Sequence, residues 1–349
     1  MQIKYTLLFL LIIYINSCQL EKAERVISID LTQRSSNVKY SQFIDSLSYI
    51  TLNPGDTCLL SGIKKIYFDE DTIIVQDTKR DGICVFTSNG NFIKQINYIG
   101  NGPQEYHNSN AISVDTIHNH IQVYDVMNFK INTYTYRGEF IKSTKVNYFI
   151  QDFEIIENGN KIMIQPYNNK SYKKNGVWLS SASNEFIKQY IEYKPSDEYF
   201  EFISTFTNNT SKGIYYYDRN SDKMYVVNAD SIKLLFTIDL EQKIPLKVRH
   251  LTNPAPKDLA QYSMMYDFCI SPNIIALSYY TFEEKEPLKW VFINPQTEEY
   301  TICNNFENDI DNIETSDYRI FYKNDSTWCR VIDRNQTDCN TLIQIIHLK

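Results

Sequence analysis

The sequence lacks the short motifs that mark several large classes of enzyme. It contains no Gly-x-Ser-x-Gly segment, no His-Glu-x-x-His segment and neither of the two common glycine-rich phosphate loops. No two cysteines are spaced Cys-x-x-Cys and no cysteine stands beside a histidine, so a zinc site is not expected. These absences argue against elbow-type serine hydrolases, zinc proteases and the usual nucleotide-binding proteins, and we expect no cofactor.

Helical periodicity and clusters of basic residues are also nearly absent. Only Lys257–Tyr262 has the spacing of a helical turn, which excludes arrays of helical repeats such as TPR or HEAT. The chain of 349 residues has 35 basic and 42 acidic residues, a net charge of −7 at pH 7. This mild acidity argues against a nucleic-acid partner, which requires clustered lysine and arginine.

The sequence has one marked apolar run, Leu7–Ile13, which follows the positive charge of Lys4. The run is too short to span a bilayer stably, since a transmembrane helix needs about 20 apolar residues. A charged start, a short apolar stretch and small residues at its exit are typical of a secretory signal. We therefore expect residues 1–17 to be a signal peptide.

The exit of this segment, Ile15–Asn16–Ser17–Cys18, resembles the bacterial lipobox, in which two smaller residues separate an aliphatic residue from an obligatory cysteine. The resemblance implies that Cys18 becomes a lipidated N-terminus and that its acyl chains anchor the protein in a membrane. The alternative is an ordinary signal peptide with an incidental cysteine. We expect residues 18–30 to form a tether and residues 31–349 to form the folded domain.

Six further cysteines follow Cys18, and an even number in an exported chain permits disulfides. Cys84 and Cys269 lie within apolar strand patterns, where we expect buried free thiols. Cys303, Cys329 and Cys339 lie nearer to loops, and two of these three could form one disulfide.

The chain contains an internal repeat. Residues 73–94 align without a gap with residues 121–142, at a constant offset of 48 that pairs Asp77 with Asp125, Phe86 with Tyr134, Gly90 with Gly138 and Phe92 with Phe140. A third copy ends at residues 184–188, where Asn184 replaces the turn glycine, and asparagine is the residue other than glycine that best tolerates positive φ. A fourth copy contains Asp218, and a fifth, looser copy covers residues 274–294.

Each copy has the pattern of four short strands separated by turns, and the 27 Tyr and 19 Phe suit such pleated surfaces. A period of about 45 residues with four strands predicts a β-propeller blade, whereas a β-solenoid would need a shorter period. Blades are expected to begin near residues 63, 110, 151, 204 and 267, with residues 313–349 forming an incomplete last blade. A strand such as Ser48–Leu52 would complete that blade and close the ring, which removes exposed sheet edges. We predict an all-β, six-bladed propeller with four-stranded antiparallel blades, and keep five or seven blades as alternatives.

The segment Ile99–Tyr106 reads Ile-Gly-Asn-Gly-Pro-Gln-Glu-Tyr and follows the first full repeat. Together with the Phe-Ile-Lys outer strands, it resembles the Gly-x-Gly-Pro-x-Glu-Tyr connection of the six-bladed propeller lipoproteins of Bacteroidota. These are NHL-like propellers, most of them without an assigned role. The resemblance covers residues 25–349, is strongest over residues 63–145, and implies an outer-membrane lipoprotein that faces the periplasm or the exterior.

Residues Glu105, Tyr106 and His107 of this connection are the candidate ligand-binding residues. In one interpretation the segment only connects two blades, with Glu105 accepting hydrogen bonds from loop amides and Tyr106 packed beneath. In the other, Glu105 faces a ligand. His107 lies either near the central channel or on a surface loop.

Two recurring features resemble metal sites but have simpler explanations. Asp77, Asp125 and Asp218 follow the same strand of their blades, as the carboxylates of calcium-dependent lactonase propellers would, but aspartate at such a point commonly caps a turn. His118 and His120 would share one face of an extended chain, and we expect them in a solvated turn. The segment Asn324–Trp328 resembles a sialidase Asp-box superficially and is expected to be an ordinary hairpin.

The sequence leaves two functions open, and for both we expect a monomer. The first is a non-enzymatic binding or scaffold module that uses loops at the propeller ends to contact a protein partner or a glycan. Tyr215–Tyr217 and Tyr279–Tyr280 are candidate contact residues for it, with strand packing as their alternative. The second is a hydrolase or lyase, which would need two carboxylates, or one with a histidine, converging within about 6 Å at one mouth of the channel.

Overall fold

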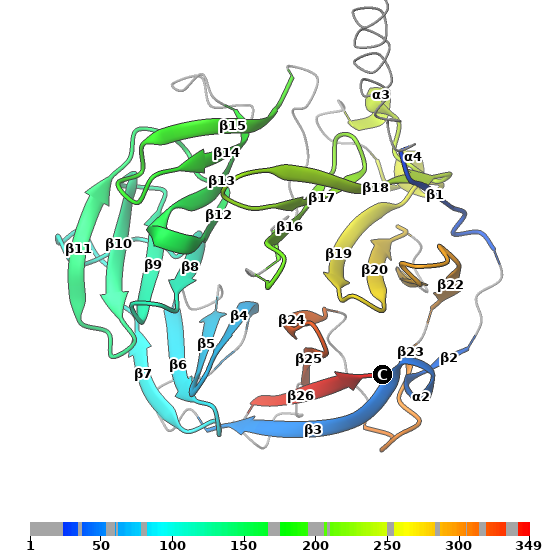
Figure 1. The fold of residues 1–349 in the computed structure, drawn as a ribbon, viewed down its shortest axis with the longest axis horizontal. Coiled ribbons are helices and arrows are strands. Elements are labelled where there is room, and N and C mark those ends of the chain that lie inside the picture. Colours follow the sequence, from blue (N-terminus) through cyan, green and yellow to red (C-terminus); the bar gives the residue numbers. More distant parts are fainter. Residues whose placement is uncertain are drawn as a thin grey trace, which may run out of the picture.

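Short strands form six four-stranded sheets that stand in a ring, each sheet running from the centre outward (Figure 1). The computed structural model describes residues 24–33, 37–53, 60, 62–77, 82–166, 175–194, 206–207, 210–249, 255–282, 287–304, 306–313, 319–332 and 341–349. The arrangement is a six-bladed β-propeller and confirms the fold predicted from the repeat.

The first three blades follow the chain without exchange of strands. From the centre outward they comprise β4 (Ile63–Asp69), β5 (Thr72–Asp77), β6 (Gly82–Thr87) and β7 (Phe92–Ile96) in blade one, β8 (Ala111–Asp115), β9 (His120–Asp125), β10 (Lys130–Thr135) and β11 (Phe140–Lys145) in blade two, and β12 (Asp152–Ile155), β13 (Lys161–Gln165), β14 (Gly176–Ser180) and β15 (Phe186–Glu192) in blade three. Their first strands begin within one residue of the predicted starts.

Of the last three blades, blades four and six each include a strand from the N-terminal part of the chain. Blade four comprises β16 (Ile214–Asp218), β17 (Lys223–Val227), β18 (Ile232–Leu240) and β1 (Val26–Ile29), blade five comprises β19 (Met264–Ile270), β20 (Ile275–Tyr280), β21 (Leu288–Ile293) and β22 (Tyr300–Cys303), and blade six comprises β24 (Phe321–Asn324), β25 (Thr327–Ile332), β26 (Thr341–Leu348) and β3 (Ile44–Leu52). A two-stranded sheet joins β2 (Val38–Lys39) to β23 (Phe306–Glu307), and the short helices are α2 (Tyr40–Phe43), η2 (Glu157–Gly159), α3 (Leu246–Arg249) and α4 (Pro256–Leu259). Helix α4 lies where the sequence predicted a helical turn.

Strand β3 closes the ring. It pairs antiparallel with β26, placing Ile50 opposite Ile343 and Ser48 opposite Ile345. The N-terminal strand predicted to complete the last blade is therefore confirmed. Beyond β3, the Asn53 N–H donates to the Gly90 carbonyl at 2.9 Å, so the closing strand also contacts the outer turn of blade one.

The segment before β3 is more ordered than the sequence suggested. Strand β1 pairs in parallel with β18 at the outer edge of blade four, and β2 pairs in parallel with β23. Ile27 and Ile29 are buried there, because alternate residues of β1 face the core between blades four and five. Residues 26–29 of the segment expected to be a tether are thus part of the propeller.

The apolar core is divided into six clusters, one at each interface between neighbouring blades. All residues of the innermost strands β8 and β12 are buried, because each blade is covered on both faces by its neighbours. The outermost strands β11 and β15 carry mostly exposed or half-buried residues, and their lysines make these edges poor templates for another strand.

The cysteines differ in part from expectation. Cys269 is a buried free thiol as predicted, and Cys303 and Cys329 are free as well. The prediction of a free thiol for Cys84 is wrong, because Cys84 is disulfide-bonded, to a partner outside the described residues. Burial in an apolar strand does not distinguish a free thiol from a bridged one. Cys18, Cys58 and Cys339 also lie outside the described residues.

The repeated turns allow a direct comparison of two glycines. Gly90 and Gly138 have φ of 84° and 79°, and Asn184 at the third copy has φ of 69°, which confirms the reason for its replacement. A Cβ added to Gly90 would lie 2.0 Å from the Thr51 backbone oxygen, whereas one added to Gly138 would meet the flexible Lys94 side chain at 3.0 Å.

We expect Gly90→Ala to lower the free energy of unfolding by more than about 1 kcal/mol, and by more than Gly138→Ala does. Both substitutions strain a left-handed residue, but only the first forces the closing strand to move. Urea denaturation of the two variants measures the difference. Equal losses would show that the contact between Gly90 and Thr51 does not hold the closing strand.

Candidate functional site

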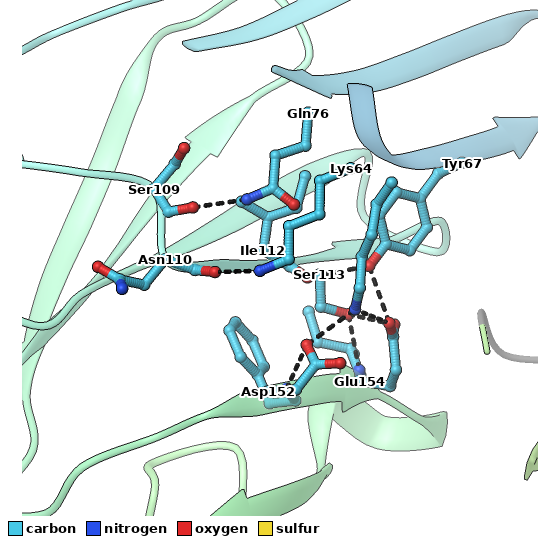
Figure 2. A network of polar contacts seen from close by, with 12 residues as sticks. Lys64, Tyr67, Gln76, Ser109, Asn110, Ile112, Ser113, Asp152 and Glu154 are labelled. Atoms are coloured by element: carbon cyan, nitrogen blue, oxygen red, sulfur yellow. Dashed lines mark hydrogen bonds and ion pairs between the residues drawn. The ribbon is translucent and has the colours of Figure 1, made fainter. Parts of the chain in front are cut away.

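A buried charged network lies on the innermost strands of blades one, two and three (Figure 2). Lys65 of β4 reaches β12, where its Nζ lies 2.8 Å from Asp152 Oδ1 and 2.7 Å from Glu154 Oε1. These three side chains are at most 6% exposed. Asp152 and Glu154 are two residues apart on one strand, so their side chains leave the same face and converge on one nitrogen.

Neighbouring hydroxyl groups complete this channel network, which we define as Lys65, Tyr67, Ser113, Asp152 and Glu154. The Tyr67 hydroxyl lies 2.9 Å from Glu154 Oε1 and 2.9 Å from the Ile112 carbonyl oxygen. Ser113 Oγ donates to Glu154 Oε2 at 2.9 Å. Glu154 therefore contacts an ammonium group and two hydroxyl groups, which come from the two strands β4 and β8.

Burial governs the protonation of the network. Desolvation raises the pKa of Glu154 to about 7, although the Lys65 charge opposes the shift, and the nearby Asp152 charge adds to it. Burial would lower the pKa of Lys65, but the charges of Asp152 and Glu154 outweigh it and raise that pKa well above its usual value. Lys65 is thus held as a cation, and it faces two carboxyl groups with one positive charge.

Cavities adjoin both ends of the network. The larger, here called the mouth cavity, has a volume of about 170 Å³ and is lined from the ends of β4, β8 and β12 and from β24, including Tyr67, Phe68, Asp115, Glu154, Glu157, Tyr322 and Lys323. A smaller cavity of about 60 Å³ is lined by residues such as Lys64, Lys65, Asp267 and Arg319. An open groove of about 400 Å³, lined by residues 210–211 and 322–326, shares Tyr322 and Lys323 with the mouth cavity.

The candidate residues Glu105 and Tyr106 have the contacts of a connector. Glu105 Oε2 accepts a hydrogen bond from the Gly102 N–H at 2.7 Å, and a Cβ on Gly100 would lie 2.2 Å from the same oxygen. Gly100 is therefore required because the carboxylate occupies the space beside it. Tyr106 is fully buried between blades one and two, and its hydroxyl donates to the Ile96 carbonyl at 2.8 Å.

His107 is half-buried, with 34% of its side chain exposed. Its backbone N–H donates to Asp125 Oδ2 at 3.2 Å, and its Nδ1 lies 2.9 Å from Asn128 Nδ2. None of the three connection residues lines the cavities described above. Their role in binding stays a prediction, in which the buried Tyr106 would act by supporting its neighbours.

Two of the three recurring aspartates, Asp125 and Asp218, cap turns as the simpler explanation predicted, whereas the turn after Asp77 lies outside the described residues. Asp125 Oδ1 accepts the Met127 N–H at 3.1 Å, and Asp218 Oδ1 accepts the Asn220 N–H at 3.1 Å. His118 is 58% exposed in the β8–β9 turn, with Nδ1 2.8 Å from Asp115 Oδ2. Across the described part of the chain, no group of three or more His, Cys, Asp or Glu residues is arranged to hold a metal ion.

The two remaining candidates also have structural roles. Tyr215–Tyr217 and Tyr279 are buried, so strand packing accounts for them, and Tyr280 is half-buried. Residues 324–328 form the β24–β25 hairpin, where Asn324 Oδ1 accepts the Ser326 N–H at 3.1 Å.

Sequence reasoning missed Lys65, Asp152 and Glu154. The available signal was a charged residue inside strands that are otherwise apolar, as in Asp-Phe-Glu-Ile-Ile and Ile-Lys-Lys-Ile. A charge at such a position must find a partner, since an unpaired buried charge is strongly unfavourable. The sequence could not supply the partners, which lie 87 and 89 residues from Lys65.

Comparisons with known proteins identify a family and a fold. A family model described as Domain of unknown function (DUF4934) matches residues 25–337. A crystal structure from Bacteroides fragilis, of a protein described as exported, is 17% identical, has a TM-score of 0.70, and is matched over 93% of this chain and 99% of that one. A member of the DUF4221 family from Bacteroides vulgatus is 12% identical, with a TM-score of 0.53, over 88% and 97% of the two chains. No curated protein matches the chain.

The raised pKa of Glu154 predicts a pH-dependent stability. A carboxyl group whose folded pKa is about 7 instead of 4.5 binds a proton more readily in the folded state. Its stabilising contribution is complete below about pH 4.5 and is lost as pH rises through about 7. The free energy of unfolding of the wild type, relative to that of Glu154→Gln, should therefore fall between pH 5 and 7 and level off above.

Urea denaturation at several pH values tests this expectation. Glu139→Gln makes the same chemical change on an exposed turn and is the matched control. A difference between wild type and Glu154→Gln that stays constant over this range would contradict a raised pKa.

Proposed function

The chain belongs to the DUF4934 family, and from its fold and channel we propose that it is a non-enzymatic binding or scaffold propeller, exported and tethered to the outer membrane by a lipid on Cys18. Its ligand in this proposal is a protein partner or a glycan, bound by a monomer at the loops of a propeller end. We also propose that the chain is related to the NHL-like propeller lipoproteins of Bacteroidota.

The binding proposal rests on the contacts that the ionisable groups of the channel make with one another. Lys65 contacts both Asp152 and Glu154, and Glu154 also contacts Tyr67 and Ser113. A group held in this way braces three blades and is poorly placed to exchange partners with a substrate. Recognition then falls to the loops that this rigid frame presents.

The disulfide of Cys84 supports export. Disulfides persist in oxidising compartments such as the bacterial periplasm and the cell surface, and are rare in the cytosol. The signal-like residues 1–17 and Cys18 point the same way but lie outside the described residues. Within the described residues, no helix is long and apolar enough to cross a membrane.

One observation favours the alternative of a hydrolase or lyase acting in the channel. Asp152 and Glu154 converge on a single nitrogen, and a carboxyl group with a pKa of about 7 is suited to general acid–base catalysis. Such an enzyme would have to bring the reacting group of a substrate into the mouth cavity and against Glu154.

An activity comparison separates the two functions. We expect the full chain, purified from membranes in detergent, to convert panels of glycans and lactones no faster than the Glu154→Gln variant does. Product formation by the wild type that Glu154→Gln abolishes, with folding retained by circular dichroism, would replace the binding proposal with the enzymatic one.

Lipidation of Cys18 is tested by metabolic labelling. Cells expressing the wild type and supplied with an alkyne fatty acid should yield a labelled protein in the membrane fraction. Cys18→Ser should lose both the label and the membrane association, while Ser17→Ala serves as a neighbouring control. A wild-type protein that is cleaved and exported without label would favour the ordinary signal peptide.

A further inference from the structure

The mouth cavity has a negatively charged lining. Three carboxyl groups, those of Asp115, Glu154 and Glu157, line it, against the single ammonium group of Lys323. Behind Glu154, the charge of Lys65 is shared with Asp152 and cannot neutralise both carboxylates. A cavity lined in this way favours a cationic ligand over an anionic one.

Glu154 retains one place for a further hydrogen-bond donor. A carboxylate can accept about four hydrogen bonds, and Glu154 has three hydrogen-bonding partners in the structure. Lys65 and Tyr67 occupy Oε1, whereas Oε2 accepts only from Ser113 Oγ, at 2.9 Å (Figure 2). Glu154 is 1% exposed and also lines the mouth cavity. An N–H group within the cavity could therefore complete its hydrogen bonding.

The walls of the cavity already accommodate ammonium groups. Lys323 Nζ lies 5.3 Å from the centre of the Phe68 ring, and Lys65 Nζ lies 5.9 Å from the centre of the Tyr67 ring. Aromatic faces attract cations at such distances. Tyr322 also borders the cavity, and its hydroxyl donates to Asp325 Oδ1 at 2.7 Å, outside the network.

The size of the cavity restricts the ligand. A volume of about 170 Å³ is below the range of about 300–1,000 Å³ that is typical of sites for drug-sized molecules. The cavity can take a head group of a few atoms. The adjoining groove, which shares Tyr322 and Lys323, leaves room for the remainder of a longer molecule.

From these observations we propose that the mouth cavity binds a primary ammonium group, with Glu154 Oε2 accepting a hydrogen bond from the ligand. This rests on the proposed binding function and names the chemistry of one ligand. The ammonium group belongs either to a free small amine or to a lysine side chain of a protein partner. Lys323 opposes the ligand, because its charge stands in the same cavity.

Isothermal titration with matched probes tests the proposal. Ethanolamine carries the ammonium group, and 1-propanol has nearly the same shape without the charge. Nα-acetyl-lysine methylamide represents an amine carried by a protein. At pH 8 and low salt we expect one or both amines to bind the full chain in detergent and 1-propanol not to bind. The tighter amine then indicates the source.

Two variants should change the amine affinity in opposite directions. Glu154→Gln should weaken binding at least about tenfold, because it removes a charge-assisted hydrogen bond. Lys323→Met should strengthen it about fivefold, because it removes a like charge at the cavity. Lys323 is half-buried on a hairpin, so this variant keeps the test valid if Glu154→Gln folds poorly. Glu139→Gln, distant in the fold, should leave the affinity unchanged.

Three results would overturn the inference: no binding of either amine, equal binding of ethanolamine and 1-propanol, or no gain in affinity with Lys323→Met. Failure of the proposed function would give a different experimental result. If membranes yield a specific partner while neither amine binds, the binding function stands and only the ammonium site is lost. Catalytic turnover that depends on Glu154 would remove the binding function itself.

Discussion

The pairing of β3 with β26 is the contact on which the rest of the ring depends. A propeller blade has little core of its own, and the six apolar clusters lie between blades. Each cluster therefore requires that its two blades be held side by side. For five of the six interfaces the covalent chain provides this, but blades six and one are joined only by the return of the N-terminal strand. The contact between Asn53 and Gly90 carries the closure on into blade one.

The channel network makes a second kind of connection within this closed frame. Burying Lys65, Asp152 and Glu154 removes three charged groups from water, a loss that ion pairing repays only when the geometry is good. The distances of 2.7–2.9 Å and the hydroxyls of Tyr67 and Ser113 provide that geometry. The network links blade one to blade three across the strand of blade two, so it fixes three blades relative to one another. The network also places the Glu154 carboxyl group, whose charge Lys65 neutralises only in part, at the edge of the mouth cavity.

The sequence was informative where structure is local and repeated. The turns at Gly90, Gly138 and Asn184 could be predicted because each needs a left-handed residue at the same point of its blade, and the capping by Asp125 and Asp218 follows from adjacent backbone. Contacts without a local signature could not be predicted. The four residues of β1 are compatible with many edges, and nothing in them specifies the parallel partner β18. The partners of Lys65 likewise depend on the ring, which brings distant strands together.

The position of β1 has a consequence for how the molecule would be presented at a membrane. Seven residues separate Cys18 from Val26, and an extended chain advances at most about 3.6 Å per residue. Because β1 runs along the outer edge of blade four, a lipid on Cys18 would hold the ring by its circumference and within about 30 Å of the bilayer (Figure 1). Blade one would then lie on the side of the ring opposite the point of attachment (Figure 1).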